Sequence, residues 1–153
     1  DPGPDNQGRS PGAIYPLIHD AEALEFLRQN VDGSPVVLEG VTTQYRWTPR
    51  VAVYTGLPVL VGWEWHQVQQ RGAGGAEPAA VRRRIADVRT MYTTTDTAWF
   101  MKTLRGYGIS YIYVGPAERL YFPAAGIEKF EALVGNGLEH YFSNSIVTIY
   151  SVQ

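Results

Sequence analysis

The residues best suited to chemistry by type and spacing lie in residues 62–71, which read "GWEWHQVQQR". On an extended chain Trp63 and Trp65 face one side while Glu64 and His66 face the other, because side chains alternate along a strand. Indole rings stack on the apolar faces of sugars, and a carboxylate beside an imidazole bonds hydroxyl groups. Further polar side chains follow in this segment: Gln67, Gln69, Gln70 and Arg71. The segment predicts a substrate-binding surface. The alternative is a strand end where one tryptophan packs in the core and His66 and Glu64 bond locally.

A carboxylate outside this segment, Glu39, completes the set of candidate substrate-binding residues: Trp63, Glu64, His66, Gln69, Arg71 and Glu39. Glu39 ends an apolar stretch, and it would approach Glu64 if their two strands were neighbours in a sheet. Two facing carboxylates are what a glycoside hydrolase requires. A free-standing hydrolase that uses Glu39, Glu64 and His66 therefore stays open as a third hypothesis.

Other reaction classes lack their motifs in this sequence. No glycine-rich phosphate loop follows a strand, no serine lies in a nucleophile elbow, and there is no cysteine. His19, His66 and His140 are far apart in the sequence and lack the spacing of metal ligands. We therefore predict no catalytic residue, no metal and no cofactor for this chain.

Glu118 and Arg119 directly follow the strongest strand pattern, residues 109–115 ("ISYIYVG"). Ligands of α/β sheets commonly bind just beyond the carboxyl ends of strands, which makes this position a second candidate. A structural ion pair is the preferred interpretation, because surface charge pairs are common.

Composition indicates one soluble domain. The chain has 153 residues, a net charge of −2 and 44% hydrophobic residues, which is enough for one core and gives no electrostatic case for nucleic acid. No run reaches the roughly 18 apolar residues of a membrane span. The opening "DPGPDNQGRSPG" has the composition of a linker. We expect a flexible linker over residues 1–15 and a single domain over residues 16–153.

The elements that must position these residues alternate between helices and strands. Apolar periodicity predicts helices over residues 20–31, 78–92, 96–104 and 126–134, with Asp20 and Asp96 as N-caps and Pro78 as a first helical residue. Apolar β-branched runs predict strands over residues 36–41, 109–115, 138–143 and 146–152, and two strand-like pieces over residues 51–56 and 57–63. Helices between strands indicate an α/β layered single domain with a central mixed β-sheet flanked by helices and an antiparallel C-terminal strand pair.

Four motifs occur in an order typical of a known family. "YTGLPVLVGWEWHQVQQR", "RRRIADVRTMYTTTD", "YGISYIYVGPAERLYF" and "VTIYSV" together resemble the C-terminal part of the YYY-type multi-spanning membrane proteins of bacteria and archaea, Chlor_Arch_YYY. The resemblance covers about residues 39–152. At the first motif it extends to Gly62, Trp63, His66, Gln69 and Arg71, whereas Gln67 departs from a position that is often acidic in the family.

This resemblance implies an extracytoplasmic domain that follows a bundle of transmembrane helices. The family looks like the GT-C glycosyltransferases, which take sugars from polyprenyl-phosphate carriers, and whose acidic catalytic residues lie in the membrane part. The resemblance thus implies a non-catalytic chain that assists substrate or acceptor binding. Its implied partners are the transmembrane part of the same polypeptide and a lipid-linked sugar or glycan acceptor. Oligosaccharyltransferase catalytic subunits offer a parallel, because their soluble domains recognise the acceptor through a tryptophan-containing motif. The alternative from another class is a structural or interaction module without a ligand site.

Overall fold

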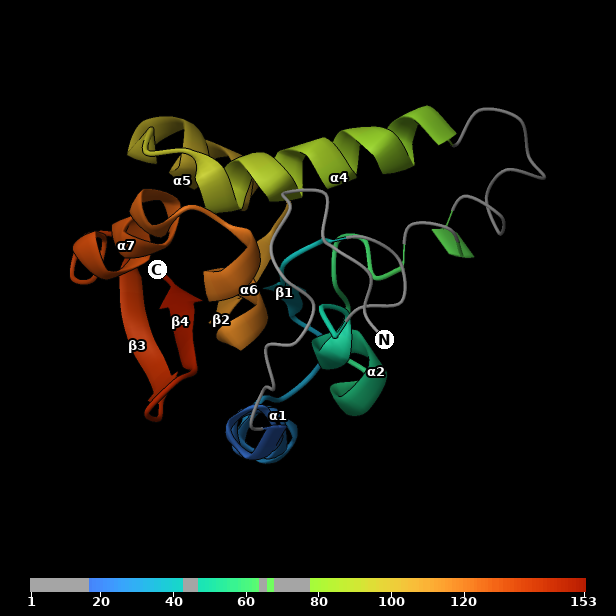
Figure 1. The fold of residues 1–153 in the computed structure, drawn as a ribbon, viewed down its shortest axis with the longest axis vertical. Helices are drawn as coiled ribbons and strands as arrows, with labels where there is room; N and C mark the ends of the chain where they lie inside the picture. Colours follow the sequence, from blue (N-terminus) through green and yellow to red (C-terminus); the bar gives the residue numbers. More distant parts are fainter. Residues whose placement is uncertain (1–16, 43–46, 64–65, 68–77) are drawn as a thin grey trace.

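The computed structural model describes residues 17–42, 47–63, 66–67 and 78–153. The predicted linker, residues 1–15, lies outside these residues. The elements run, in chain order, α1 (Leu17–Asn30), β1 (Val36–Leu38), α2 (Arg50–Thr55), α4 (Pro78–Thr93), α5 (Thr97–Gly106), β2 (Ile109–Val114), α6 (Pro116–Tyr121), α7 (Ala124–Ala132), β3 (Leu138–Ser143) and β4 (Thr148–Val152). Figure 1 shows their arrangement. None of the helices among the described residues is long and apolar enough to cross a membrane.

The four strands form one mixed sheet in the order β1-β2-β4-β3. β1 pairs with β2 in parallel, whereas β2 with β4 and β4 with β3 are antiparallel. The tight turn between β3 and β4 is built on Asn144, whose side-chain oxygen accepts from the N–H groups of Ile146 and Val147. The mixed sheet and the antiparallel C-terminal pair confirm the predicted fold class.

Helices cover both faces of this sheet, so that the domain has three layers (Figure 1). Alternation along β2 divides the core: Ile112 and Val114 pack with α4, α5 and α7, whereas Tyr113 packs with α1 and α2. The larger core includes Phe100 of α5 and Phe130 of α7, whose rings meet edge-on with centroids 5.4 Å apart. Each helix therefore contributes one apolar stripe to a sheet that is buried on both sides.

Local sequence signals place several helix ends correctly. α4 begins at Pro78, and the side chain of Asp96 caps α5 by accepting from the N–H of Trp99 at 2.9 Å. The predicted cap at Asp20 is wrong, because α1 begins at Leu17 and Asp20 is a fully buried residue of its first turn. Asp20 instead joins an ion network, described below.

The strand predicted over residues 51–56 is also wrong: this stretch forms α2. The N–H of Val51 donates to the Glu39 carboxylate at 2.8 Å, so that one N–H group of the first helical turn has a hydrogen-bond partner. Gly56 ends the helix in the left-handed region at φ 76°. Tertiary contacts thus override the β-propensity of two valines and a tyrosine. The second predicted strand-like piece, residues 57–63, is confirmed in part, because Val59 forms an isolated parallel bridge to Val37 of β1.

Candidate functional site

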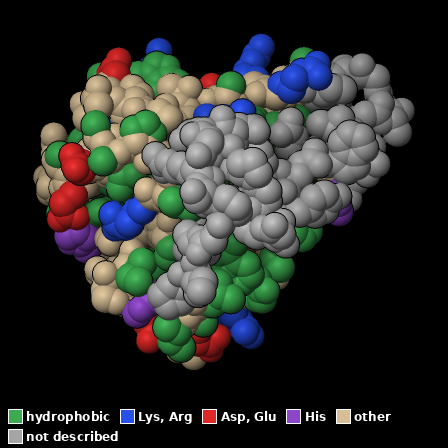
Figure 2. All heavy atoms as spheres, viewed as in Figure 1, with side chains coloured by type: hydrophobic (Ala, Val, Ile, Leu, Met, Phe, Trp, Pro, Cys, Tyr) green, Lys and Arg blue, Asp and Glu red, His purple; other side chains and the backbone are tan. Residues whose placement is uncertain are grey.

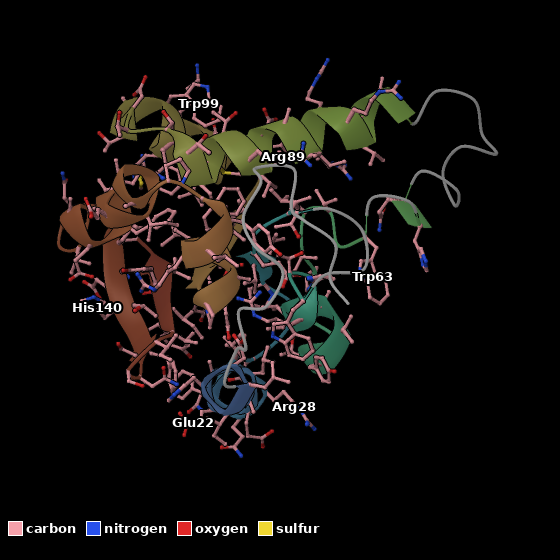
Figure 3. All side chains as sticks on the ribbon, in the orientation of Figure 1. Glu22, Arg28, Trp63, Arg89, Trp99 and His140 are labelled. Carbon is pink, nitrogen blue, oxygen red and sulfur yellow. The ribbon has the colours of Figure 1, made fainter. Side chains whose placement is uncertain are left out.

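Trp63 and His66, two of the four described residues of the predicted binding segment, lie at the surface. Trp63 keeps 37% of its area exposed and lies beside α2 (Figure 3). The ring centroids of Trp63 and His66 are 5.3 Å apart, and the N–H of Gln67 donates to the Trp63 carbonyl at 3.1 Å. This bond spans four residues, as in a helical turn, so the predicted extended alternation is wrong here: Trp63 and His66 face the same side rather than opposite sides.

Three of the predicted site residues, Glu64, Gln69 and Arg71, lie outside the described residues. The predicted approach of Glu64 to Glu39 therefore stays a prediction. Glu39 itself is 3% exposed, and one of its carboxylate oxygens bonds the N–H of Val51 at the start of α2. Glu39 is thus placed below α2 rather than at the surface that carries Trp63.

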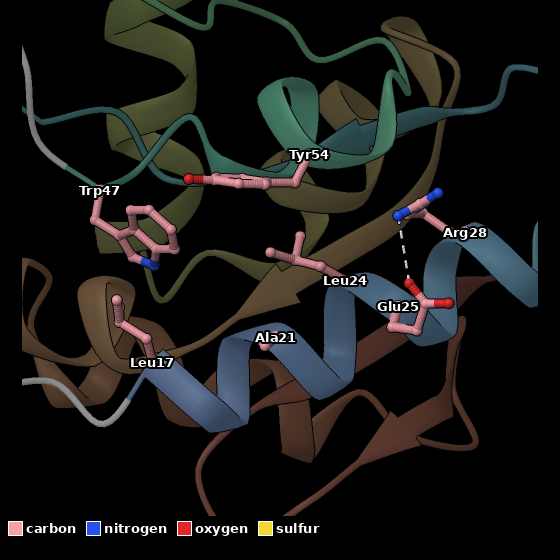
Figure 4. A pocket seen from close by; sticks show the side chains of 7 residues that line it. All are labelled: Leu17, Ala21, Leu24, Glu25, Arg28, Trp47 and Tyr54. Atoms are coloured by element: carbon pink, nitrogen blue, oxygen red, sulfur yellow. Dashed lines mark ion pairs between the residues drawn. The ribbon is translucent and has the colours of Figure 1, made fainter.

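Two hollows that share part of their lining open beside α2, the smaller of them next to Trp63, and sequence reasoning did not foresee them. The larger, of about 310 Å³, is lined by Leu17, Ala21, Leu24, Glu25, Arg28, Trp47 and Tyr54 (Figure 4). The smaller, of about 180 Å³, is lined by Trp47, Pro49, Arg50, Val53, Tyr54 and Trp63. Trp47 and Tyr54 belong to both, with ring centroids 5.3 Å apart at an angle of 50°. We call these two hollows together the aromatic groove.

Helix α1 forms one side of the aromatic groove and α2 forms the other. Leu17, Ala21 and Leu24 lie at i, i+4 and i+7 of α1, so that they share one face of the helix, and Figure 4 shows them below Trp47 and Tyr54. Glu25 and Arg28 form an ion pair of 3.5 Å at one end. The groove is therefore mainly apolar, with charged groups at its rim.

Behind the groove lies a buried ion network centred on Arg50. Its guanidinium donates to Asp20 at 2.9 Å and to the Glu118 carboxylate at 2.5 Å and 3.3 Å, and the three side chains have no exposed area. Burial opposes the charge of Arg50, but the carboxylates of Glu118 and Asp20 hold its pKa well above the usual value. A buried guanidinium is tolerated because both carboxylates pair with it. The predicted surface pair between Glu118 and Arg119 is therefore wrong: Glu118 is buried and pairs with Arg50, whereas Arg119 donates to the carbonyl of Ile146.

The network holds Trp47 in place. Asp20 accepts hydrogen bonds from the Trp47 indole at 2.8 Å and from the Tyr113 hydroxyl at 2.6 Å, in addition to that from Arg50. Arg50 also bonds the carbonyls of Trp47 and Thr48. The indole of Trp47, which lines both hollows, is therefore fixed by buried charge, and its N–H is already used within the protein.

Two glycines allow the close approach of these groups. A Cβ atom at Gly115 would lie 2.7 Å from Nη2 of Arg50, and one at Gly40 would lie 2.9 Å from Oε1 of Glu118. The N–H groups of both glycines donate to the Glu118 carboxylate. Any side chain at either position would push the network apart.

Glu39 is the unusual carboxylate of this region. Burial raises its pKa to about 8 from the usual 4.5, against the opposing charge of Arg50. Its Oε1 has no hydrogen-bond partner among the described residues. Glu39 therefore keeps its proton near neutral pH, when an exposed glutamate is ionised.

The buried tyrosines do not favour acid–base chemistry. Burial raises the pKa of Tyr92 and of Tyr113 above the usual value, so that both remain protonated at neutral pH. Tyr92 donates to the carbonyls of Leu38 and Tyr113 and thereby ties α4 to β1 and β2. Among the described residues, no group of three or more histidines and carboxylates is placed to hold a metal ion. The geometry described here is suited to binding at the groove, with a rigid charged support beneath it.

Sequence reasoning missed Trp47, Tyr54, Arg50 and Asp20, which form or support the groove. One signal was present: "RWTPR", residues 46–50, puts an indole and two cations next to a proline between two apolar segments. The partners of this segment lie 27 to 68 residues away along the chain, as in the bonds of Asp20 to Trp47 and Glu118 to Arg50. No pattern of neighbouring residues indicates contacts between residues so far apart in the sequence.

Comparison with solved structures gives a likeness of fold. No family model matches the chain, and no curated protein matches its sequence, so the resemblance to Chlor_Arch_YYY stays a prediction. Among solved structures, the chain resembles the C-terminal globular domain of an oligosaccharyltransferase from Archaeoglobus fulgidus, with a TM-score of 0.53 and 12% sequence identity. The match covers 92% of this chain and 100% of that domain. At this identity the likeness concerns the fold, and the chain shares the fold of that oligosaccharyltransferase domain.

Proposed function

We propose that this chain is a non-catalytic, extracytoplasmic domain of a membrane glycosyltransferase of the GT-C type that uses polyprenyl-phosphate sugars. The observation that carries the proposal is the likeness to an oligosaccharyltransferase domain, which extends over the whole of that domain. The four ordered sequence motifs support the same conclusion independently of the fold. The partners are then the transmembrane part of the same polypeptide and a lipid-linked sugar or glycan acceptor.

The role of the domain in this proposal is to assist substrate or acceptor binding. Trp63 and His66 present neighbouring rings at the surface, and the aromatic groove continues from Trp63 to Trp47 and Tyr54. Exposed aromatic side chains with polar groups at one end are typical of recognition sites. We include Glu64, Gln69 and Arg71 in the proposal from their positions in the sequence, since they lie outside the described residues. Glu39 acts from below, by holding the first turn of α2.

An NMR titration of the 153-residue chain tests this role. The indole N–H signals are followed while a disaccharide or a short acceptor peptide is added, first with the wild type and then with the double variant Trp63→Ala, His66→Ala. We expect saturable shifts in the wild type and their loss in a variant that keeps the circular dichroism spectrum and melting temperature of the wild type. A variant that unfolds, or indoles that respond to none of the ligands, would refute the binding role.

A structural or interaction module is the second candidate, and one observation favours it. Leu17, Ile18 and Val53 are large apolar side chains with about half or more of their area exposed. Such side chains gathered at one surface indicate a contact with another protein or with another part of the same polypeptide. This candidate predicts silence toward free sugars and peptides in the same titration.

A further inference from the structure

Basic side chains are unevenly distributed over the domain and gather on α4 and α5. Of the 13 Lys and Arg residues and 15 Asp and Glu residues of the chain, six and two respectively lie in residues 78–106, which include these two helices. The small net charge of the whole chain therefore conceals a local excess of positive charge, while the remainder of the chain is acidic. We call the surface that carries these six cations the basic face: Arg82, Arg83, Arg84, Arg89, Lys102 and Arg105.

The basic face points away from the core, because the apolar sides of both helices are already buried. Val81, Ile85 and Val88 of α4 lie at i, i+4 and i+7 and pack in the larger core, as does Phe100 of α5. Five of the six cations are exposed, and Arg84 is partly buried. Figure 2 shows Lys and Arg side chains along the top edge of the molecule, where Figure 1 places α4 and α5. The outer side of this helical layer is thus open to a partner.

The cations of the basic face have no carboxylate partner within the described part of the chain. None of the six takes part in an ion pair there, whereas the exposed Arg28 pairs with Glu25 and Arg50 is buried between two carboxylates. The one carboxylate of α4, Asp87, accepts instead from the hydroxyl of Tyr107. A solvated helix surface commonly carries both signs of charge, paired at i, i+4. Four arginines on one helix repel one another, so the packing of the fold gives no reason for them.

The chemistry and the form of the basic face favour a surface that carries many phosphate groups. Five of the six cations are arginines, and a guanidinium binds a phosphate through two parallel hydrogen bonds. These cations lie on the outside of two helices, and none of them lines either hollow of the aromatic groove. They are therefore not arranged around one small anion. An anionic bilayer presents its phosphate groups over a broad plane, and long basic side chains need only reach that plane.

We propose that the basic face docks the domain on an anionic bilayer, through the phosphate groups of its lipids. The contact is peripheral, because the apolar side of α4 stays in the core and is not offered to the hydrocarbon. The sheet separates the basic face from the aromatic groove, since α4 and α5 pack with one side of β2 and α1 and α2 with the other. Docking would thus leave the groove open. This inference goes beyond the proposed function and rests on it only for the presence of a membrane.

Co-sedimentation of the 153-residue chain with lipid vesicles tests the docking. Two kinds of vesicle are compared at about 0.1 M NaCl: phosphatidylcholine alone, and phosphatidylcholine with about 30% phosphatidylglycerol. We expect binding to the anionic vesicles that weakens as salt is added, and little binding to the neutral ones. A labelled DNA duplex, followed by fluorescence anisotropy in the same buffer, serves as a polyanion of another class.

A matched pair of variants then locates the contact. Arg83→Gln removes an exposed cation of the basic face, whereas Arg119→Gln makes the same change on α6, where the side chain bonds the carbonyl of Ile146. Each cation at an anionic surface contributes a factor of about five in affinity, so Arg83→Gln should bind about fivefold more weakly and Arg119→Gln as the wild type does. The triple variant Arg82→Gln, Arg83→Gln, Arg89→Gln should bind about a hundredfold more weakly. Its melting temperature should be at least that of the wild type, because it removes like charges from one helix.

The outcomes separate this inference from the proposed function. Equal affinity for the two kinds of vesicle, no binding to either, or equal effects of Arg83→Gln and Arg119→Gln would overturn the docking. Tighter binding of the DNA duplex than of the anionic vesicles, per phosphate, would overturn it too and make the basic face a nucleic-acid surface. The indole titration tests substrate binding separately. Silent indoles together with charge-dependent vesicle binding would refute the binding role and support the docking.

Discussion

Replacing Glu39 with Gln should remove a pH dependence of stability that the buried carboxyl group imposes on the domain. Glutamine has the shape of the protonated side chain, and its carbonyl can still accept from the N–H of Val51. Below about pH 4.5 Glu39 is protonated in both the folded and the unfolded chain, so variant and wild type differ there only by a fixed offset. This offset is small, because each side chain leaves one buried polar atom without a partner.

The sign of the effect follows from the raised pKa. Between pH 4.5 and about 8 the unfolded chain releases the Glu39 proton while the folded chain keeps it, so the free energy of unfolding of the wild type falls as pH rises. Above about pH 8 the folded carboxyl ionises too, and the difference reaches its limit. The shift from 4.5 to about 8 corresponds to roughly 5 kcal/mol as an upper bound.

Urea unfolding of both proteins at several pH values measures this difference. We expect the free energy of unfolding of Glu39→Gln to exceed that of the wild type increasingly from pH 5 to pH 8, by several kcal/mol at the upper end. Glu128→Gln, an exposed carboxylate of α7, is the matched control and should show no comparable slope. A gap between Glu39→Gln and wild type that is constant over this range would refute a buried, protonated Glu39.

Three further substitutions test the supports of the groove and the core. Arg50→Met leaves Asp20 and Glu118 buried without their counter-charge and should cost about 3–5 kcal/mol in urea unfolding, whereas retained stability would contradict a buried ion network. Gly115→Ala places a Cβ atom 2.7 Å from Arg50 and should cost about 1–3 kcal/mol. The control is Gly106→Ala, whose Cβ atom would have no neighbouring atom within 4 Å and which should be neutral. Equal melting temperatures of these two variants would count against the close approach at Gly115. Lys129→Met removes the hydrogen bonds from its side-chain nitrogen to the carbonyls of Met91 and Gly126 and should cost about 1–3 kcal/mol of stability. Lys102→Met, on the exposed face of α5, serves as the control. An equal loss of stability in both variants would argue against these bonds.

Buried charge and surface recognition are linked in this domain through Trp47. Its ring belongs to both hollows, while its N–H belongs to the network of Asp20 and Arg50. A rigid support of this kind reduces the entropy that a binding surface loses when it meets its ligand. Stability and recognition should therefore change together when the network is altered.

Much of the fold could be predicted because its signals are local. Asp96 before α5 and Asn144 between β3 and β4 act through hydrogen bonds to residues at most three positions away, and Pro78 at the start of α4 acts through its own fixed φ angle. The apolar run of β2 predicts a strand buried on both faces, and the antiparallel pair follows from a tight turn between two short strands.

The sequence by itself determined the fold class and the C-terminal strand pair, because capping, turn geometry and apolar periodicity act between near neighbours. Only the tertiary structure decided that residues 50–55 form a helix, that Trp63 and His66 share a side, and that Asp20 is buried rather than a cap. The groove forms where α1, α2 and Trp47 pack around the guanidinium of Arg50. This packing depends on the pairing of buried charges that lie far apart in the sequence, and no pattern of neighbouring residues encodes such pairing.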